Sequence, residues 1–271
     1  MHPKATLTKQ ITRWRNCQPA CDEDHLVVEE PLEIRVGGQS LVVVMRTPGH
    51  DFDLAAGFLF TEGLIASSDD IGAIVYCEDV EQANLQNIIN VHLTNGQALG
   101  EQKGWQRSFH ANASCGLCGK MTIESVRQEI SPIESHIQID QSVFYQLSNK
   151  LRSAQPVFVA TGGLHAAGLF DTQGELQITR EDVGRHNAVD KVIGQALLAE
   201  QLPLETHILM ISGRASFEIV QKALFARIPV IVAVSAASSL AVELAQESEV
   251  TLIGFMRGMG MTVYSRPDRI R

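Results

Sequence analysis

The chain has 271 residues, a formal net charge of −9 at neutral pH, and 45% hydrophobic and 20% charged residues. This balance is typical of a globular protein and excludes a disordered or fibrous chain. The acidic balance argues against a general nucleic-acid binder, but it leaves room for a local basic pocket that holds an anionic small molecule. Residues 1–17 lack the apolar run of a signal peptide, and polar residues interrupt the longest apolar stretch, so we expect a cytoplasmic protein without a membrane span.

Residues 1–20 are predicted to form a flexible tail. Residues 21–135 show short β-branched runs around one helical pattern, which predicts an N-terminal α+β domain. Its expected elements are a hairpin over 30–46 that turns at 36–40, a helix over 52–64 capped by Asp51, and strands at 71–76 and 88–93. The segment 95–120 is rich in glycine and poor in apolar residues, so we predict a long mobile loop there.

Residues 136–271 alternate between strand and helix patterns. This alternation predicts an α/β domain in which helices flank parallel strands. The expected elements are a helix at 140–154, a strand at 157–160, a hairpin over 169–178, a helix at 184–200 capped by Asp182, strands at 207–211, 230–234 and 250–255, and helices at 216–226 and 238–247.

The most specific chemical signal is a pair of thiols, Cys115 and Cys118, separated by two residues. The neighbouring thiol lowers the pKa of one member of the pair, and nearby Lys120 and His110 add positive charge that favours the reactive thiolate. The chain has five cysteines, an odd and sparse set that does not suggest a disulfide framework.

Three interpretations of the thiol pair compete. A structural zinc site would need two further ligands, and none lies at a usual spacing. A thioredoxin-like redox pair would follow an apolar strand and open a helix, and the preceding residues do not suggest that strand. The third interpretation is a sulfur relay, in which a cysteine on a flexible loop collects a persulfide from one protein and discharges it elsewhere.

Three consecutive strands of the second half end in loops of small residues, at 212–216, 235–239 and 256–260. Parallel strands would bring all three loops to one edge of the sheet, where open α/β sheets bind ligands. Helix N-termini and the charges of Arg214 and Arg257 would attract phosphates there. The sequence therefore predicts an anion or nucleotide site at this edge.

A simpler alternative is that the small residues only make tight turns, with Ser216 and Ser238 as helix caps. His165 and His186 lie nearby in the sequence. A single histidine is more often structural than functional, but these two together with Arg185 could supply hydrogen bonds or protons to a ligand. His186 and Asp190 are predicted to share one helical face and to pair.

The sequence resembles the FdhD family, the sulfurtransferases needed for formate dehydrogenase activity. The resemblance covers most of the chain and rests on an ordered set of motifs. These are the segments 53–63, the loop of Cys115 and Cys118, 161–167, 181–191, 212–222 and 255–264.

The resemblance implies a mechanism. A cysteine desulfurase would load sulfane sulfur onto Cys115, with Cys118 as the second catalytic thiol. The protein would pass the sulfur to the molybdenum or tungsten cofactor with two pterin guanine dinucleotides, on behalf of apo formate dehydrogenase. GDP or GTP would mimic that cofactor, and no bound zinc is expected. The resemblance also implies a homodimer and a three-layer, cytidine-deaminase-like C-terminal domain.

The residues expected to bind the cofactor are His165, His186, Ser212, Gly213, Arg214, Phe255, Met256, Arg257, Gly258, Met259 and Gly260. Gly260 stands where the family pattern often has a second basic residue, and Arg266 or Arg269 is expected to compensate. Deaminase chemistry is not expected, because His165 has no glutamate two residues later and no cysteine follows Cys118. The alternative function is a zinc-stabilised, non-enzymatic nucleotide-binding or chaperone protein.

Overall fold

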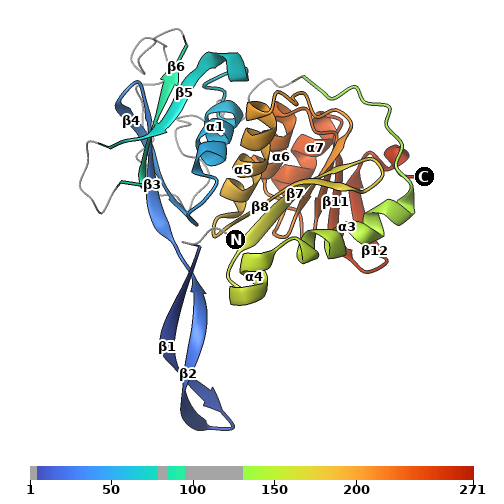
Figure 1. Cartoon of the computed structure of the whole chain (residues 1–271). Helices are drawn as coiled ribbons and strands as arrows, with labels where there is room; N and C mark the ends of the chain where they lie inside the picture. The colour runs from blue at the N-terminus through green and yellow to red at the C-terminus, as the bar shows by residue number, and fades with distance from the viewer. Residues whose placement is uncertain (1–4, 79–84, 95–130) are drawn as a thin grey trace.

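The computed structural model describes residues 5–78, 85–94 and 131–271, which form three β-sheets and the helices that pack on them (Figure 1). The mobile loop predicted at 95–120, with Cys115 and Cys118, lies outside the described residues. No helix in the described part is long and apolar enough to cross a membrane.

Strands β1 (Thr6–Arg15) and β2 (Gln18–Val27) form an antiparallel hairpin that projects from the body of the molecule (Figure 1). The predicted tail at 1–20 is therefore wrong for the residues that the structure describes. Ion pairs between the two strands stabilise this hairpin, and it has no buried apolar face. One such pair joins Arg13 to Asp22 at 3.0 Å. This explains the error, because the charged composition resembles that of a solvated tail.

The N-terminal sheet has the strand order β4-β3-β6-β5, and helix α1 covers one of its faces. Its elements are β3 (Glu30–Val36), β4 (Gln39–Arg46), α1 (Asp51–Thr61), a 3-10 turn (Ser68–Asp70), β5 (Ile71–Tyr76) and β6 (Ile88–Leu93). The predicted hairpin, helix and strands are confirmed.

The start of α1 differs from the prediction. His50, in the left-handed region with a φ of 57°, is the N-cap, and Asp51 is the first helical residue. The carboxylate of Asp51 instead pairs with Arg46, at 3.1 Å from Nε and 3.0 Å from Nη2, and both residues are buried. Asp51 is therefore not a cap, because a buried arginine takes both of its oxygens.

The C-terminal sheet has the strand order β12-β11-β10-β9-β7-β8. Its strands are β7 (His165–Asp171), β8 (Leu176–Asp182), β9 (His207–Ile211), β10 (Val230–Ala233), β11 (Thr251–Arg257) and β12 (Gly260–Ser265). The three strands β9, β10 and β11 run parallel as predicted, and the others are antiparallel to their neighbours.

Helices cover both faces of the C-terminal sheet (Figure 1). They are α3 (Gln141–Ser153), α4 (Pro156–Thr161), α5 (Arg185–Leu198), α6 (Phe217–Phe225) and α7 (Ser239–Glu247), followed by a 3-10 turn (Pro267–Arg269). Successive side chains of β9 point to opposite faces of the sheet. Ile208 and Met210 pack in the hydrophobic cluster under α3, whereas Leu209 and Ile211 pack in the cluster under α5 and α6. The mixed α/β class is confirmed.

Helix α4 replaces the strand predicted at 157–160. Pro156 occupies its first turn, and the carboxylate of Glu181 accepts hydrogen bonds from the N–H groups of Val157 and Phe158 at 3.1 and 2.7 Å. The apolar, β-branched run resembles a strand, but a carboxylate distant in the sequence caps the helix.

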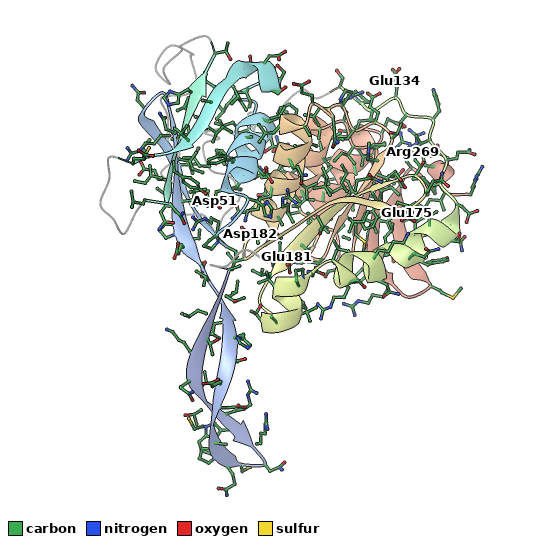
Figure 2. The ribbon with its side chains drawn as sticks, in the orientation of Figure 1. Asp51, Glu134, Glu175, Glu181, Asp182 and Arg269 are labelled. Carbon is green, nitrogen blue, oxygen red and sulfur yellow. The ribbon has the colours of Figure 1, made fainter. Side chains whose placement is uncertain are left out.

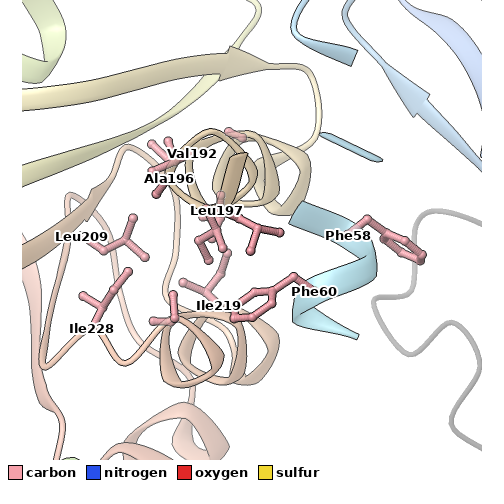
Figure 3. Close-up of a cluster of buried hydrophobic side chains, with 14 of the residues drawn as sticks. Phe58, Phe60, Val192, Ala196, Leu197, Leu209, Ile219 and Ile228 are labelled. Carbon is pink, nitrogen blue, oxygen red and sulfur yellow. The ribbon is translucent and has the colours of Figure 1, made fainter. Parts of the chain in front are cut away.

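One hydrophobic cluster joins the two sheets through α1 and α5. Figure 3 shows Phe60 of α1 turned toward Leu197 and Ile219 of the C-terminal layer. The helices touch backbone to backbone at Gly57 and Gly194, where an added Cβ would lie 1.9 and 1.8 Å from the nearest carbonyl oxygen. Glycine at both positions lets the two predicted domains share one core.

Candidate functional site

The loops after β9 and β10 meet at the carboxyl edge of the C-terminal sheet. Ala215 N–H donates to the carbonyl of Ala236 at 3.0 Å, and Phe255 N–H donates to the carbonyl of Ser235 at 3.0 Å. The prediction that these strand ends share one edge is confirmed by the parallel pairing of β9, β10 and β11. This edge is the place where an open α/β sheet binds its ligand.

The segment predicted to bind the cofactor at 255–260 is the tip of the β11–β12 hairpin, because β11 ends and β12 begins within it. Met256 is fully buried against the α3 side of the sheet, so its side chain is not exposed at the edge. The exposed residues of this tip are Phe255, Arg257, Gly258, Met259 and Gly260. Arg257 provides the full positive charge of the tip.

The arginines expected to compensate for Gly260 are engaged elsewhere. Arg266 pairs with Glu249 and Asp268. Arg269 is 1% exposed and donates to four backbone carbonyls of the surrounding chain (Figure 2). Both side chains stabilise the C-terminal end of the fold. The expectation that one of them compensates for the basic residue absent at Gly260 is therefore wrong.

Ser212 and Gly213 bring the start of β7 to the same edge. The Ser212 hydroxyl accepts from Ala166 N–H at 2.9 Å, and Ser212 N–H donates to the Ala166 carbonyl at 2.9 Å. A Cβ on Gly213 would lie 3.4 Å from Nδ1 of His165 and 3.6 Å from Cδ of Arg185. The edge therefore gathers a serine from the loop after β9, an imidazole from the start of β7 and an arginine from the start of α5.

Burial and nearby positive charges favour the neutral form of His165, while Asp182 acts in the opposite direction. Burial lowers the pKa of His165, and the charges of Arg185 and His186 lower it further. Arg214 acts in the same direction. A neutral imidazole both donates and accepts hydrogen bonds, so His165 can orient a polar ligand without adding charge.

His186 lies beside the start of α6. Its Nε2 is 3.1 Å from Oγ of Ser216 and 3.2 Å from Oε2 of Glu218, and the Ser216 hydroxyl donates to Glu218 at 2.9 Å. Burial would raise the pKa of Glu218, but the hydrogen bond and charge of His186 outweigh it and lower the pKa to about 2. One imidazole nitrogen faces both partners, so the cluster lacks the geometry of a hydrolytic triad, which uses both nitrogens.

Asp190 does not pair with His186, and that prediction is wrong. Its carboxylate lies 2.9 Å from Nζ of Lys222 and accepts from Thr61 at 2.7 Å, and all three are buried. The spacing pointed to His186 because it lies on the same helix as Asp190. Lys222 on helix α6 instead supplies the positive charge that pairs with the buried carboxylate.

Asp182 is not the cap of α5, since Gly184 occupies the N-cap position. The Asp182 carboxylate is fully buried, lies 2.7 Å from Nζ of Lys191, and accepts from Thr47 N–H at 3.1 Å. Asp182, which is labelled in Figure 2, therefore connects the turn before α1 to the C-terminal sheet.

A cavity of about 530 Å³ opens beside this edge, between α3, α4 and the ends of β9 and β10. Sequence reasoning missed it because it depends on α4, which was predicted to be a strand. It is lined by Ser148, Asn149, Leu151, Arg152, Gln155, Phe158, Gly162, Gly163, Leu164, His165, Ser212 and Val234.

Cys115 and Cys118, the thiols predicted to be reactive, lie outside the described residues. Among the described residues, Cys17, Cys21 and Cys77 are free thiols. No group of histidine, cysteine or carboxylate side chains in the described part of the chain is arranged to hold a metal ion.

Known proteins match the chain along almost its whole length. The family model described as FdhD/NarQ family matches residues 27–271. The "Sulfur carrier protein FdhD" of Mycolicibacterium paratuberculosis is 49% identical, with 98% of this chain and 99% of that protein covered. The protein of the same name from Sulfolobus acidocaldarius is 42% identical, with 96% and 97% covered.

The fold agrees with these matches. A crystal structure from Desulfotalea psychrophila, of a protein described as a formate dehydrogenase accessory protein, superposes with a TM-score of 0.78 at 25% identity. It covers 98% of this chain and 100% of that chain. Because the family model matches residues 27–271 and a relative that covers 98% of the chain is 49% identical to it, this chain belongs to the FdhD/NarQ family.

Proposed function

We propose that this protein is a sulfurtransferase that carries sulfur as a persulfide on Cys115 and delivers it to the molybdenum or tungsten bis-guanine-dinucleotide cofactor that formate dehydrogenase needs. The observation that supports it most is the 49% identity, over nearly the full chain, to a relative named as a sulfur carrier protein. The relatives' names indicate that sulfur is carried, and the description of the similar crystal structure indicates a link to formate dehydrogenase. The chemistry is inferred from the residues of this chain.

The carboxyl edge fits the anionic part of that substrate. Arg185, Arg214 and Arg257 lie on three segments around it, and the buried Arg185 Nε has no hydrogen-bond partner among the described residues. Guanidinium groups bind phosphates with paired hydrogen bonds. These positive charges support the proposal that the edge binds a substrate with several phosphates.

The loading step is a thiol exchange. The Cys115 thiolate attacks the terminal sulfur of the desulfurase persulfide, a new S–S bond forms, and the desulfurase cysteine leaves as a thiolate. On delivery the S–S bond breaks with its electron pair on Cys115, and the metal centre supplies the two electrons that reduce the sulfur to sulfide. The metal chemistry is that of the substrate. The protein supplies the thiolate and binds the phosphate groups of the substrate.

Complementation of a strain that lacks this protein tests the proposal. Cys115→Ala should abolish formate dehydrogenase activity, and Cys118→Ala should be milder if that thiol only resolves or tunes the persulfide. Cys17→Ala, at an exposed thiol of the β1–β2 turn, is the matched control and should retain activity. Full activity in Cys115→Ala would end the proposal.

Guanine nucleotide binding tests the substrate half separately. GDP should bind the purified protein by calorimetry, and Arg214→Ala and Arg257→Ala should each weaken it roughly tenfold, as the loss of a charge-assisted hydrogen bond predicts. Absence of GDP binding to the wild type would remove the guanine part. Stoichiometric zinc in the purified protein would instead favour the zinc-stabilised alternative.

Two finer features belong to the same proposal. The helices on both faces of the C-terminal sheet support the cytidine-deaminase-like arrangement implied by the resemblance. The proposal also includes a homodimer and a cysteine desulfurase as the sulfur donor, which light scattering and a pull-down with the purified desulfurase would test.

A further inference from the structure

We propose that a second cavity, between the two halves of the chain, is a docking site for a partner protein that inserts an arginine side chain there. The cavity has a volume of about 430 Å³, and residues of both halves line it. The inference does not depend on sulfur transfer or on the carboxyl edge, because a different part of the molecule carries it.

The cavity lies where three helices end. Phe60 in the last turn of α1, Leu197 in the last turn of α5 and Phe225 at the end of α6 all line it. Helix α5 begins at the carboxyl edge and has 14 residues, so its far end lies about 20 Å from that edge at a rise of about 1.5 Å per residue. A partner docked at the cavity would therefore leave the edge open to its substrate.

The surroundings of the cavity are negative. Helix C-termini carry partial negative charge, and the last turns of α1 and α5 contain no basic residue that offsets it. Asp69 and Glu200, both exposed, add two carboxylates to the lining. The described lining contains no lysine, arginine or histidine. The cavity therefore complements a cation.

Two basic side chains near the cavity already have other partners. Lys222, in the last turn of α6, is buried and lies 2.9 Å from the carboxylate of Asp190. Arg227, just after α6, pairs with Glu205 and donates to the carbonyl of Ser131 at 2.8 Å. The carboxylates that line the cavity are therefore available to a cation from outside the chain.

The walls of the cavity favour arginine among the possible cations. Phe60 and Phe225 meet edge to face with their ring centres 6.3 Å apart, and Leu202 and Pro203 extend the apolar wall. A guanidinium is weakly hydrated and packs on aromatic rings, whereas the ammonium of lysine is strongly hydrated. A calcium ion needs at least six oxygen ligands, and two carboxylates supply too few. The methylene groups of an arginine side chain also pack well on apolar residues.

The size of the cavity favours a protein segment over a free small cation. One arginine side chain fills only part of the volume of about 430 Å³, so flanking residues of the partner can enter as well. Protein interfaces often bury an arginine in a pocket with a polar rim, and Ser68, Asp69 and Glu200 supply polar groups here. The partner that fits is a protein with an exposed basic segment.

Calorimetry with the full-length protein and the peptide acetyl-Gly-Arg-Leu-Gly-amide tests the proposal. The control peptide carries citrulline, the neutral isostere of arginine, and should bind roughly five- to tenfold more weakly because it has no charge. A peptide with lysine in place of arginine should bind with intermediate affinity. Added salt should weaken the arginine peptide and leave the citrulline peptide unchanged.

Three variants locate the peptide. Asp69→Asn and Glu200→Gln should each weaken the arginine peptide about two- to fivefold, the value of one exposed ion pair. Phe225→Leu keeps the wall apolar but removes the ring, and it should weaken the peptide by about the same factor. Glu243→Gln, at an exposed carboxylate of α7 outside the cavity, is the matched control and should bind like the wild type.

Three results would overturn the proposal. The first is no binding of the arginine peptide at millimolar concentration, or equal binding of the arginine and citrulline peptides. The second is unchanged affinity in all three cavity variants. The third is binding of butylguanidinium, the side chain without a peptide, as tightly as the peptide, which would assign the cavity to a small molecule. Sulfur loading on Cys115 and GDP binding are measured separately, so this proposal and the proposed function can fail independently.

Discussion

Gly57→Ala tests how the two sheets are held together. The added Cβ would lie 1.9 Å from the Asp190 carbonyl oxygen and 2.9 Å from Gly194 N, both backbone atoms of α5. A carbon and an oxygen approach no closer than about 3.3 Å, so the helices must separate by more than 1 Å. Overpacking of this kind costs about 1 to 3 kcal/mol, and we expect the upper end because no flexible side chain can give way.

Urea denaturation followed by circular dichroism measures this loss, which corresponds to roughly 6 to 12 °C in melting temperature for a chain of this size. Gly260→Ala is the matched control, because its Cβ would make only an ordinary contact of 3.5 Å with the Arg257 carbonyl. It should change stability by less than about 0.5 kcal/mol. A loss below about 1 kcal/mol in Gly57→Ala would refute the backbone contact between α1 and α5.

Three further predictions concern charged groups. Lys222→Met leaves the Asp190 carboxylate buried without its cation, so we expect a loss of about 3 to 5 kcal/mol by denaturation, and partial recovery when Asp190→Asn is added. His186→Ala should raise the pKa of Glu218 from about 2. The folded pKa of Glu218 lies below its unfolded value, so its ion pair stabilises the fold above pH 4.5 and this stabilisation is lost toward pH 2. The difference in unfolding free energy between His186→Ala and the wild type should therefore shrink as the pH falls through that window. A difference that stays constant would contradict the ion pair. Glu181→Ala should destabilise α4 by about 1 kcal/mol, and an unchanged melting temperature would argue against its capping role.

The regular elements of the fold were predictable where local pattern and burial agree. The strands at 71–76, 88–93 and 207–211 have the predicted bounds, because each is an apolar run between turn residues. The predictions of a tail at 1–20 and of a strand at 157–160 were wrong for physical reasons. The β1–β2 hairpin depends on charge pairs between strands, and α4 depends on a carboxylate of β8, so no local pattern reveals either.

The candidate site was predictable only in part. Parallel strands follow from the alternation of patterns, and the shared edge follows from parallel strands. Partner choice was not predictable, because Asp190 pairs with Lys222 and Asp182 with Lys191 through the tertiary fold. The cavity at Gln155 arises where α3, α4 and two strand ends converge, which no spacing in the sequence encodes.

The most direct test of the account is mass spectrometry of the protein after incubation with a cysteine desulfurase and cysteine. The Cys115 peptide should gain one sulfur, about 32 Da, which a reducing agent removes, and the Cys17 peptide should stay unchanged. No added sulfur on Cys115, or equal labelling of the exposed thiol at Cys17, would contradict a dedicated persulfide carrier.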